Sequence, residues 1–149
     1  MDTNASATSI RDTDSSRRRP IAAVLLGLYA LALAAIAFWP VPIDRGIARL
    51  LRAISEAVPW LTYPRIEFGA NVAMFVPLGI LAGLILRRRW ILAVPLALAA
   101  SGVIEVGQAL FLTQRTASLL DVVANVLGAA FGAVLVGVTS RNMPDTRAR

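Results

Sequence analysis

Residues 101–132, SGVIEVGQALFLTQRTASLLDVVANVLGAAFG, form two apolar segments joined by a short turn, and both segments contain polar side chains. Glu105 and Gln108 lie three residues apart, so they share one face of a helix. Asp121 and Asn125 share a face of the next helix in the same way. A charged side chain at the centre of a membrane-spanning helix costs about 2.5–3.5 kcal/mol. We therefore expect the two polar faces to meet each other rather than lipid.

The composition is typical of a membrane protein. Of the 149 residues, 57% are hydrophobic and 16% are charged, against about 25% charged in soluble domains. The absence of Cys and His excludes disulfides, the usual zinc sites and His-based catalytic triads. The net charge is +6 and every basic residue is Arg, but the arginines flank apolar runs, which favours membrane topology over nucleic-acid binding. We expect no metal and no cofactor.

Four apolar segments are long enough to span a membrane, which needs about 20 residues. The predicted spans cover about residues 21–39, 68–86, 90–112 and 119–138. The first could instead be a signal peptide, but its length and the bulky Phe38 and Trp39 at its end favour a retained span. The sequence thus predicts an all-α fold, a polytopic membrane protein with a four-helix transmembrane bundle.

Three further segments lie outside these spans. Residues 1–19 and 140–149 are polar and are predicted to be cytoplasmic tails, the first of them disordered. Residues 43–58 predict an amphipathic helix, with charged side chains opposite an apolar stripe made of Ile43, Ile47, Leu50, Leu51, Ile54 and Val58. This helix either lies in the membrane interface or covers the other spans, and the sequence favours the two equally.

The arginines predict the orientation in the membrane. Ten arginines fall on the side that holds both termini and the turn at 87–89, and five fall on the other side. The positive-inside rule therefore puts both termini in the cytoplasm of a multi-pass plasma-membrane protein. The turn around Arg115 then faces outward.

Polar side chains from three spans are expected to converge in the outer third of the membrane. At about 1.5 Å of rise per residue, Glu105 lies roughly 10 Å deep and Asn125 roughly 9 Å deep. The sequence predicts an outward-opening polar pocket whose ligand-binding residues are Asn71, Glu105, Gln108, Arg115, Ser118, Asp121 and Asn125. The alternative is that these side chains only hold the helices together by hydrogen bonds. A buried carboxyl at Glu105 must be protonated, hydrated or paired, and Arg115 is the nearest basic residue along the chain.

At these residues the chain resembles the VanZ-like family of small bacterial membrane proteins, whose founding member is associated with teicoplanin resistance. The matching pattern is Asn71-x3-Phe75-x-Pro77-x-Gly79, then Glu105-x2-Gln108, then Arg115-x2-Ser118-x2-Asp121-x3-Asn125-x2-Gly128. The resemblance implies a transmembrane domain over residues 20–139 and a bacterial cell membrane. It marks the motif residues as site candidates without assigning them chemistry.

Structural roles are expected for Phe75, Pro77, Gly79, Gly128 and Gly132. Pro77 lacks a backbone N–H, which predicts a kink and a freed carbonyl in the second span. Gly128 and Gly132 form a GxxxG pair, which predicts close packing of the fourth span and could also join two copies of the chain.

Three classes of function fit an outward-facing polar pocket. The favoured one is binding or shielding of an amphipathic cell-envelope molecule, of the lipid-linked precursor or lipoglycopeptide type. The second is a membrane enzyme acting on a lipid head group, with Glu105 and Asp121 as acid and base and Arg115 holding a phosphate. The third is a subunit of a small transporter or channel, although four spans are too few for a transporter alone. Membrane lipids or an envelope amphipath are the expected partners.

Overall fold

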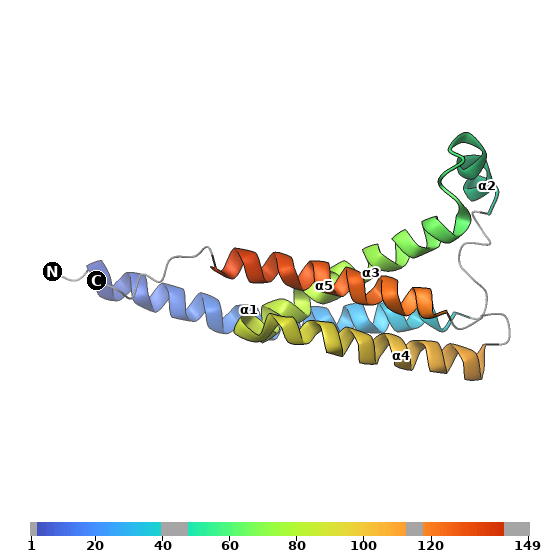
Figure 1. Cartoon of the computed structure of the whole chain (residues 1–149). Coiled ribbons are helices and arrows are strands. Elements are labelled where there is room, and N and C mark those ends of the chain that lie inside the picture. The colour runs from blue at the N-terminus through green and yellow to red at the C-terminus, as the bar shows by residue number, and fades with distance from the viewer. Residues whose placement is uncertain (1–2, 40–47, 113–117, 142–149) are drawn as a thin grey trace.

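The computed structural model describes residues 3–39, 48–112 and 118–141, and all regular structure in these ranges is helical. The elements are α1 (Thr3–Ala37), α2 (Ala48–Ala57), α3 (Tyr63–Leu86), the short 3-10 helix η2 (Arg87–Leu92), α4 (Ala93–Phe111) and α5 (Leu119–Arg141). Helices α1, α3, α4 and α5 lie side by side, whereas α2 stands beyond the start of α3 (Figure 1). The prediction of an all-α fold is confirmed for the described part of the chain.

Three helical segments of the described chain are long and apolar enough to cross a membrane, namely residues 19–37, 63–111 and 119–140. The middle segment has 49 residues and contains α3, η2 and α4. It folds back on itself at η2 (Figure 1), where Arg87 has a φ of 50° and Arg89 departs from helical geometry. A positive φ at a non-glycine residue is unfavourable in a helix, so α3 ends here although neither Gly nor Pro follows at once.

Two helices begin earlier than predicted. Helix α3 begins at Tyr63 rather than at residue 68, and Pro64 suits its first turn because an N–H there would have no partner within the helix. Helix α1 begins at Thr3, so it covers residues for which the sequence predicts a disordered tail. Once a helix is nucleated, each added residue brings one more hydrogen bond, and the apolar half of α1 can therefore extend into the polar residues before it.

Glycines set the separation of α3 and α5, which make the most extensive contact between described helices. A Cβ added at Gly128 or at Gly132 would fall on a backbone carbonyl oxygen of α3. From the α3 side, a Cβ at Gly79 would fall on the carbonyl oxygen of Ala129. Small residues let helix backbones approach this closely, and van der Waals packing then holds them together in lipid. A second copy binding through Gly128 and Gly132 would need a surface that α3 already covers.

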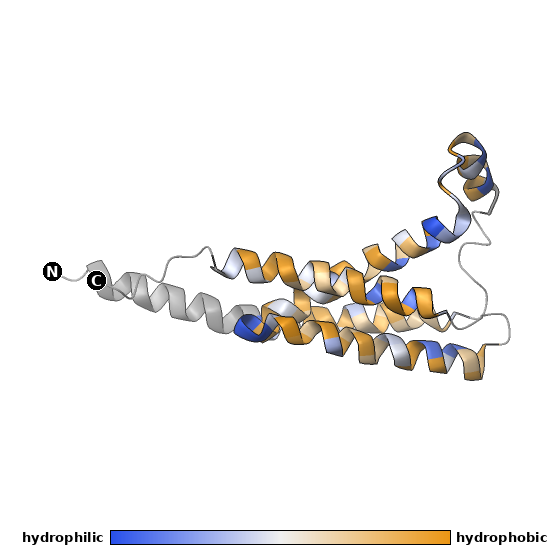
Figure 2. Ribbon diagram, in the orientation of Figure 1, coloured by the Kyte–Doolittle hydropathy of each residue, from blue (hydrophilic) through white to orange (hydrophobic). Residues whose placement is uncertain are grey.

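Small side chains fill the interior and large apolar ones point outward. Ala93, Ala97 and Ala133 are fully buried, whereas Leu31 is 68% exposed and Leu119 is 84% exposed. Hydrophobic residues recur along the lengths of α4 and α5 (Figure 2). Such extensive exposed apolar surface is expected where lipid rather than water surrounds the helices.

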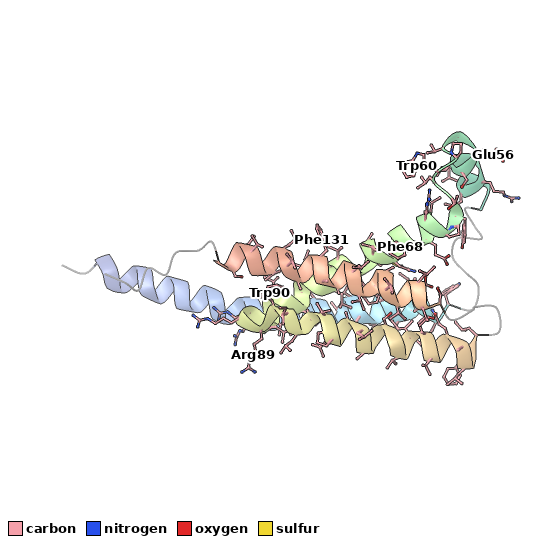
Figure 3. The ribbon with its side chains drawn as sticks, viewed as in Figure 1. Glu56, Trp60, Phe68, Arg89, Trp90 and Phe131 are labelled. Carbon is pink, nitrogen blue, oxygen red and sulfur yellow. The ribbon has the colours of Figure 1, made fainter. Side chains whose placement is uncertain are left out.

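Helix α2 lies beyond one end of α3, and η2 lies at the other end, where α3 folds back onto α4. Figure 3 shows Glu56 and Trp60 near α2 at one end, and Arg89 near the fold-back of α3 onto α4 at the other. The contact of α2 with α3 is slight, and Trp60 is 67% exposed. Helix α2 therefore does not cover the sides of the bundle. The first residues of the helix predicted at 43–58 lie outside the described ranges.

Candidate functional site

A cavity of about 60 Å³ lies where α1, α3, α4 and α5 meet. Its polar lining consists of Asn71 from α3, Glu105 and Gln108 from α4, and Asp121 and Asn125 from α5. Its apolar lining is made of Leu33, Ile36, Ala37, Met74, Phe75 and Ile104. One water needs about 10–15 Å³ of such volume, so the cavity has room for a few waters or one small polar group. The polar side chains predicted to converge thus line one cavity, which α1 closes on its apolar side.

Glu105 is held at the N-terminal end of α5. Its side chain is 8% exposed, and its Oε2 accepts a 2.7 Å hydrogen bond from the backbone N–H of Ser118. Ser118 immediately precedes α5, and its own carbonyl accepts the N–H of Asp121 at 3.1 Å, as in the first turn of a helix. The positive end of a helix dipole favours a negative charge, which explains how a carboxyl is accommodated inside an otherwise apolar helix.

The Ser118 N–H that donates to Glu105 is a backbone group, whereas the sequence suggests the side chain of Arg115 as a partner. Arg115 lies outside the described residues, and so does the rest of the turn from 113 to 117. Ser118 takes part through its backbone N–H, whereas the sequence marks its side chain as a site candidate. Sequence spacing cannot reveal such a contact, because it depends on how α5 begins in space.

The side-chain amide of Asn125 donates a hydrogen bond through its nitrogen, whereas its oxygen accepts none. Its Nδ2 donates a 2.8 Å hydrogen bond to the Oγ of Ser101, which is fully buried. Its Oδ1 is the buried side-chain oxygen in the described part of the chain that lacks a hydrogen-bond partner. A buried polar atom left unsatisfied costs about 1–3 kcal/mol. Asn125 lines the cavity, so this unsatisfied oxygen belongs to a residue of its wall.

Gln108 connects α4 to the end of α1. Its Nε2 donates a 2.9 Å hydrogen bond to the carbonyl of Ala37, the last residue of α1. The final carbonyls of a helix have no partner within it, so Gln108 satisfies one of them. The bond also fixes the position of the cavity wall that α1 supplies.

Tyr29 is a contributor that the sequence analysis missed. Its hydroxyl donates a 2.8 Å hydrogen bond to the carbonyl of Met74 in α3. One residue before Met74, the carbonyl of Ala73 loses its helical donor because Pro77 has no N–H. Tyr29 is the only side chain from residue 21 to 38 that carries a hydrogen-bonding group, and that isolation is the signal that could have found it.

Asn71 and Asp121 are partly buried and complete the polar lining. Asp121 lies in the first turn of α5, where the helix dipole stabilises a carboxylate. Phe75, predicted to have a structural role, is 4% exposed and forms part of the cavity wall. The described lining therefore joins two carboxyls and three amides to an apolar wall.

The described lining residues include no hydroxyl, thiol or imidazole group. Among the described residues, no group of three or more acidic, His or Cys side chains could hold a metal ion. The carboxyls and amides can exchange hydrogen bonds, bind a cation or transfer a proton.

A protein-family model described as VanZ/LLP1 matches residues 26–140. This range contains all of α2, α3, η2 and α4, nearly all of α5, and every residue that lines the cavity. No curated protein and no solved structure matches the chain.

Proposed function

The chain belongs to the VanZ/LLP1 family, and from that premise we propose a four-span membrane protein that binds the polar group of an amphipathic envelope molecule. One observation carries this proposal. Five polar side chains from three apolar helices line a single cavity. Contact between a helix and lipid requires none of them. Polar residues inside membrane spans are costly, and they commonly mark binding sites.

Helix lengths support four spans rather than three. A continuous helix of the 49 residues from 63 to 111 would be roughly 73 Å long, more than twice the roughly 30 Å hydrocarbon core. Helix α3 alone reaches roughly 36 Å and α4 roughly 28 Å at the same rise per residue. The three arginines from 87 to 89 then lie in a turn at the membrane surface.

The proposed orientation has both termini in the cytoplasm. The end of α5, the polar half of α1 and η2 lie at the same end of the molecule (Figure 1). Ten of the fifteen arginines belong to the tails and to the turn on this side, which the positive-inside rule assigns to the cytoplasm. The polar lining lies near the end of α4 and the start of α5, and hence in the outer half of the membrane.

Helix α2 would then rest in the outer membrane interface. It stands beyond the start of α3, and both Trp60, between the two helices, and Tyr63, the first residue of α3, are exposed. Amphipathic helices lie in the plane of the interface, and Trp and Tyr are enriched at that level. This position would leave the mouth of the cavity open to lipids of the outer leaflet.

The size of the cavity defines what it can take. A volume of about 60 Å³ is too small for a whole lipoglycopeptide or lipid-linked precursor. It suits a head-group fragment, with the attached chain lying along the apolar side chains of α1. The proposed role is therefore recognition of a small polar group on a larger amphipath.

A membrane enzyme acting on a lipid head group is the second candidate. The observation that favours it is that Glu105 and Asp121 line the same cavity, as an acid and base pair would require. Turnover of a head group by the purified chain, lost in Glu105→Gln, would replace binding as the better account.

Photocrosslinking tests the binding proposal. The full chain in nanodiscs would be illuminated with a lipid that carries a diazirine on its head group, and the crosslinked residues identified by mass spectrometry. We expect adducts on cavity residues such as Met74 and Ile104, competed by unlabelled lipid. Adducts confined to outward-facing residues such as Phe131, which is 58% exposed, would contradict the proposal.

A further inference from the structure

We propose that the cavity has a lateral gate between α1 and α4, through which the head group of the amphipath enters and its apolar chain stays in the lipid. This inference rests on the proposed function, because it concerns how a ligand reaches the same cavity. The gate is closed by the end of α1, which lies against α4 through one hydrogen bond and one ring contact.

The first argument compares the helix contacts that enclose the cavity. Helices α3 and α5 approach backbone to backbone at glycines, and α4 is joined to α5 by the buried bond between Ser101 and Asn125. Helix α1 packs mainly on α3, where Tyr29 donates to the carbonyl of Met74. The contact of α1 with α4 is slight by comparison. Regions with few packing contacts open at the lowest cost, so the seam between α1 and α4 is the side of the cavity that separates most easily.

The second argument is that two small contacts close this seam. The Nε2 of Gln108 donates to the carbonyl of Ala37, and both residues line the cavity. Their neighbours along the chain meet beside this bond, because a Cβ added at Gly107 would come within 2.7 Å of the ring of Phe38. The missing side chain of Gly107 therefore leaves the place where this ring rests on α4. An outward movement of the end of α1 breaks both contacts and leaves its bond to α3 intact.

The third argument is the surface that the seam faces. A cavity of about 60 Å³ can hold a polar group but not the apolar chain attached to it, so the chain must leave the cavity. Val103 and Leu110 lie about one turn before and after Gly107 on the same face of α4, and both are exposed. Ile36 and Phe38 are exposed at the end of α1. A chain that leaves through the seam thus meets apolar side chains, which suit a lipid tail.

Reversible bridging across the seam tests the gate on the full chain. Phe38→Cys and Gly107→Cys would be introduced together into this chain, which has no native cysteine. In nanodiscs the pair would be joined by a bifunctional methanethiosulfonate, and the lipid with a diazirine on its head group would be added afterwards. We expect the bridge to reduce adducts on Met74 and Ile104 at least tenfold, and a reducing agent to restore them. Failure of the two cysteines to bridge would overturn the contact on which the gate depends.

The matched control is the pair Trp90→Cys and Gly137→Cys. A Cβ added at Gly137 would likewise fall on the ring of Trp90, and neither residue lines the cavity. Trp90 lies in η2, where α3 folds back onto α4 (Figure 3). Bridging this pair should leave the adducts unchanged. Equal losses in the two bridged pairs would overturn the proposal.

Removal of the ring tests the gate in the opposite direction. Phe38→Ala loses the ring contact but keeps the bond from Gln108, since Ala37 accepts through its backbone. Adducts would be measured by brief illumination at successive times after the lipid is added. We expect the initial rate to increase at least threefold, whereas Phe111→Ala removes an exposed ring at the end of α4 and should leave the rate unchanged. Equal rates in the native chain and in Phe38→Ala would overturn the proposal.

These outcomes separate the gate from the proposed function. Adducts inside the cavity that persist when the seam is bridged would mean that the head group enters by another route. That result would overturn this inference and leave the proposed function standing. Absence of cavity adducts in the native chain would overturn both.

Discussion

Helix α5 packs against two neighbours by opposite means. Toward α3 it presents Gly128 and Gly132, and the two backbones approach as closely as a missing Cβ allows. Toward α4 it presents Asn125, whose amide donates to Ser101. The α3–α5 contact is the more extensive of the two. The comparison teaches that one face of α5 packs by close approach of backbones, whereas another makes a buried side-chain hydrogen bond.

The largest expected effect comes from filling the α3–α5 contact. In Gly132→Ala the added methyl would fall on a carbonyl of α3, and the helices must separate. Overpacking typically costs about 1–3 kcal/mol, and this case should lie at the upper end because backbone cannot rotate away. Unfolding of the reconstituted protein by steric trapping measures the change.

The matched control is Gly102→Ala on α4, where an added Cβ meets nothing within 4 Å. It should be neutral, or stabilise the protein by up to about 1 kcal/mol, because Ala favours helix over Gly. Equal losses at Gly102 and Gly132 would mean that close packing is not what distinguishes the α3–α5 contact.

Replacing Asn125 by Leu separates adhesion from recognition. The variant loses the hydrogen bond to Ser101, worth about 0.6–2 kcal/mol in a membrane, but it also removes a buried oxygen that has no partner. We expect a net loss of stability below about 1 kcal/mol, together with a more than tenfold loss of head-group crosslinking. A large loss of stability with crosslinking intact would instead make Asn125 a purely structural residue.

Glu105→Gln should cost less stability than Glu105→Leu. Gln keeps an oxygen that can accept the N–H of Ser118, and it loses only the attraction of a charge to the start of α5, about 0.3–1 kcal/mol. Leu leaves that N–H without its acceptor and should cost about 1–3 kcal/mol. Equal stability of the two variants, measured by thermal unfolding in detergent, would show that the bond to Ser118 does not contribute.

The smallest expected effect is that of Tyr29→Phe. It removes the hydroxyl that joins α1 to the carbonyl of Met74, and such bonds average about 0.6 kcal/mol in membranes. Hydrogen exchange at the middle of α3 should increase slightly while crosslinking in the cavity persists. Loss of crosslinking in this variant would mean that α1 positions the site more strictly than its contacts suggest.

Local spacing predicted the helices and the convergence of their polar faces. Glu105 and Gln108 are spaced with the period of a helix, and so are Asp121 and Asn125. A short turn joins the two helices, so their polar faces line the same cavity. The contribution of α1 could not be predicted in this way. Gln108 and Ala37 are 71 residues apart, and the acceptor is a backbone carbonyl that any residue would carry.

The start of α1 and the hydrogen bond from the Ser118 N–H to Glu105 escaped prediction for similar reasons. The polar residues after Thr3 have no apolar periodicity, so nothing local predicts that helix extends through them. The N–H of Ser118 is likewise a backbone group, and its position depends on where α5 begins. Side-chain chemistry can be inferred from a sequence, whereas backbone partners follow from tertiary structure.

The most direct test of a polar, outward-facing cavity uses the absence of native cysteine from this chain. Single cysteines at Gln108, Asp121 and Asn125 would be probed in intact cells with a membrane-impermeant thiol reagent, and Val134, 43% exposed on α5, would serve as the lipid-facing control. We predict labelling at the three cavity positions and none at the control. Protection at all four would mean that the polar side chains only join helices, and would contradict the account.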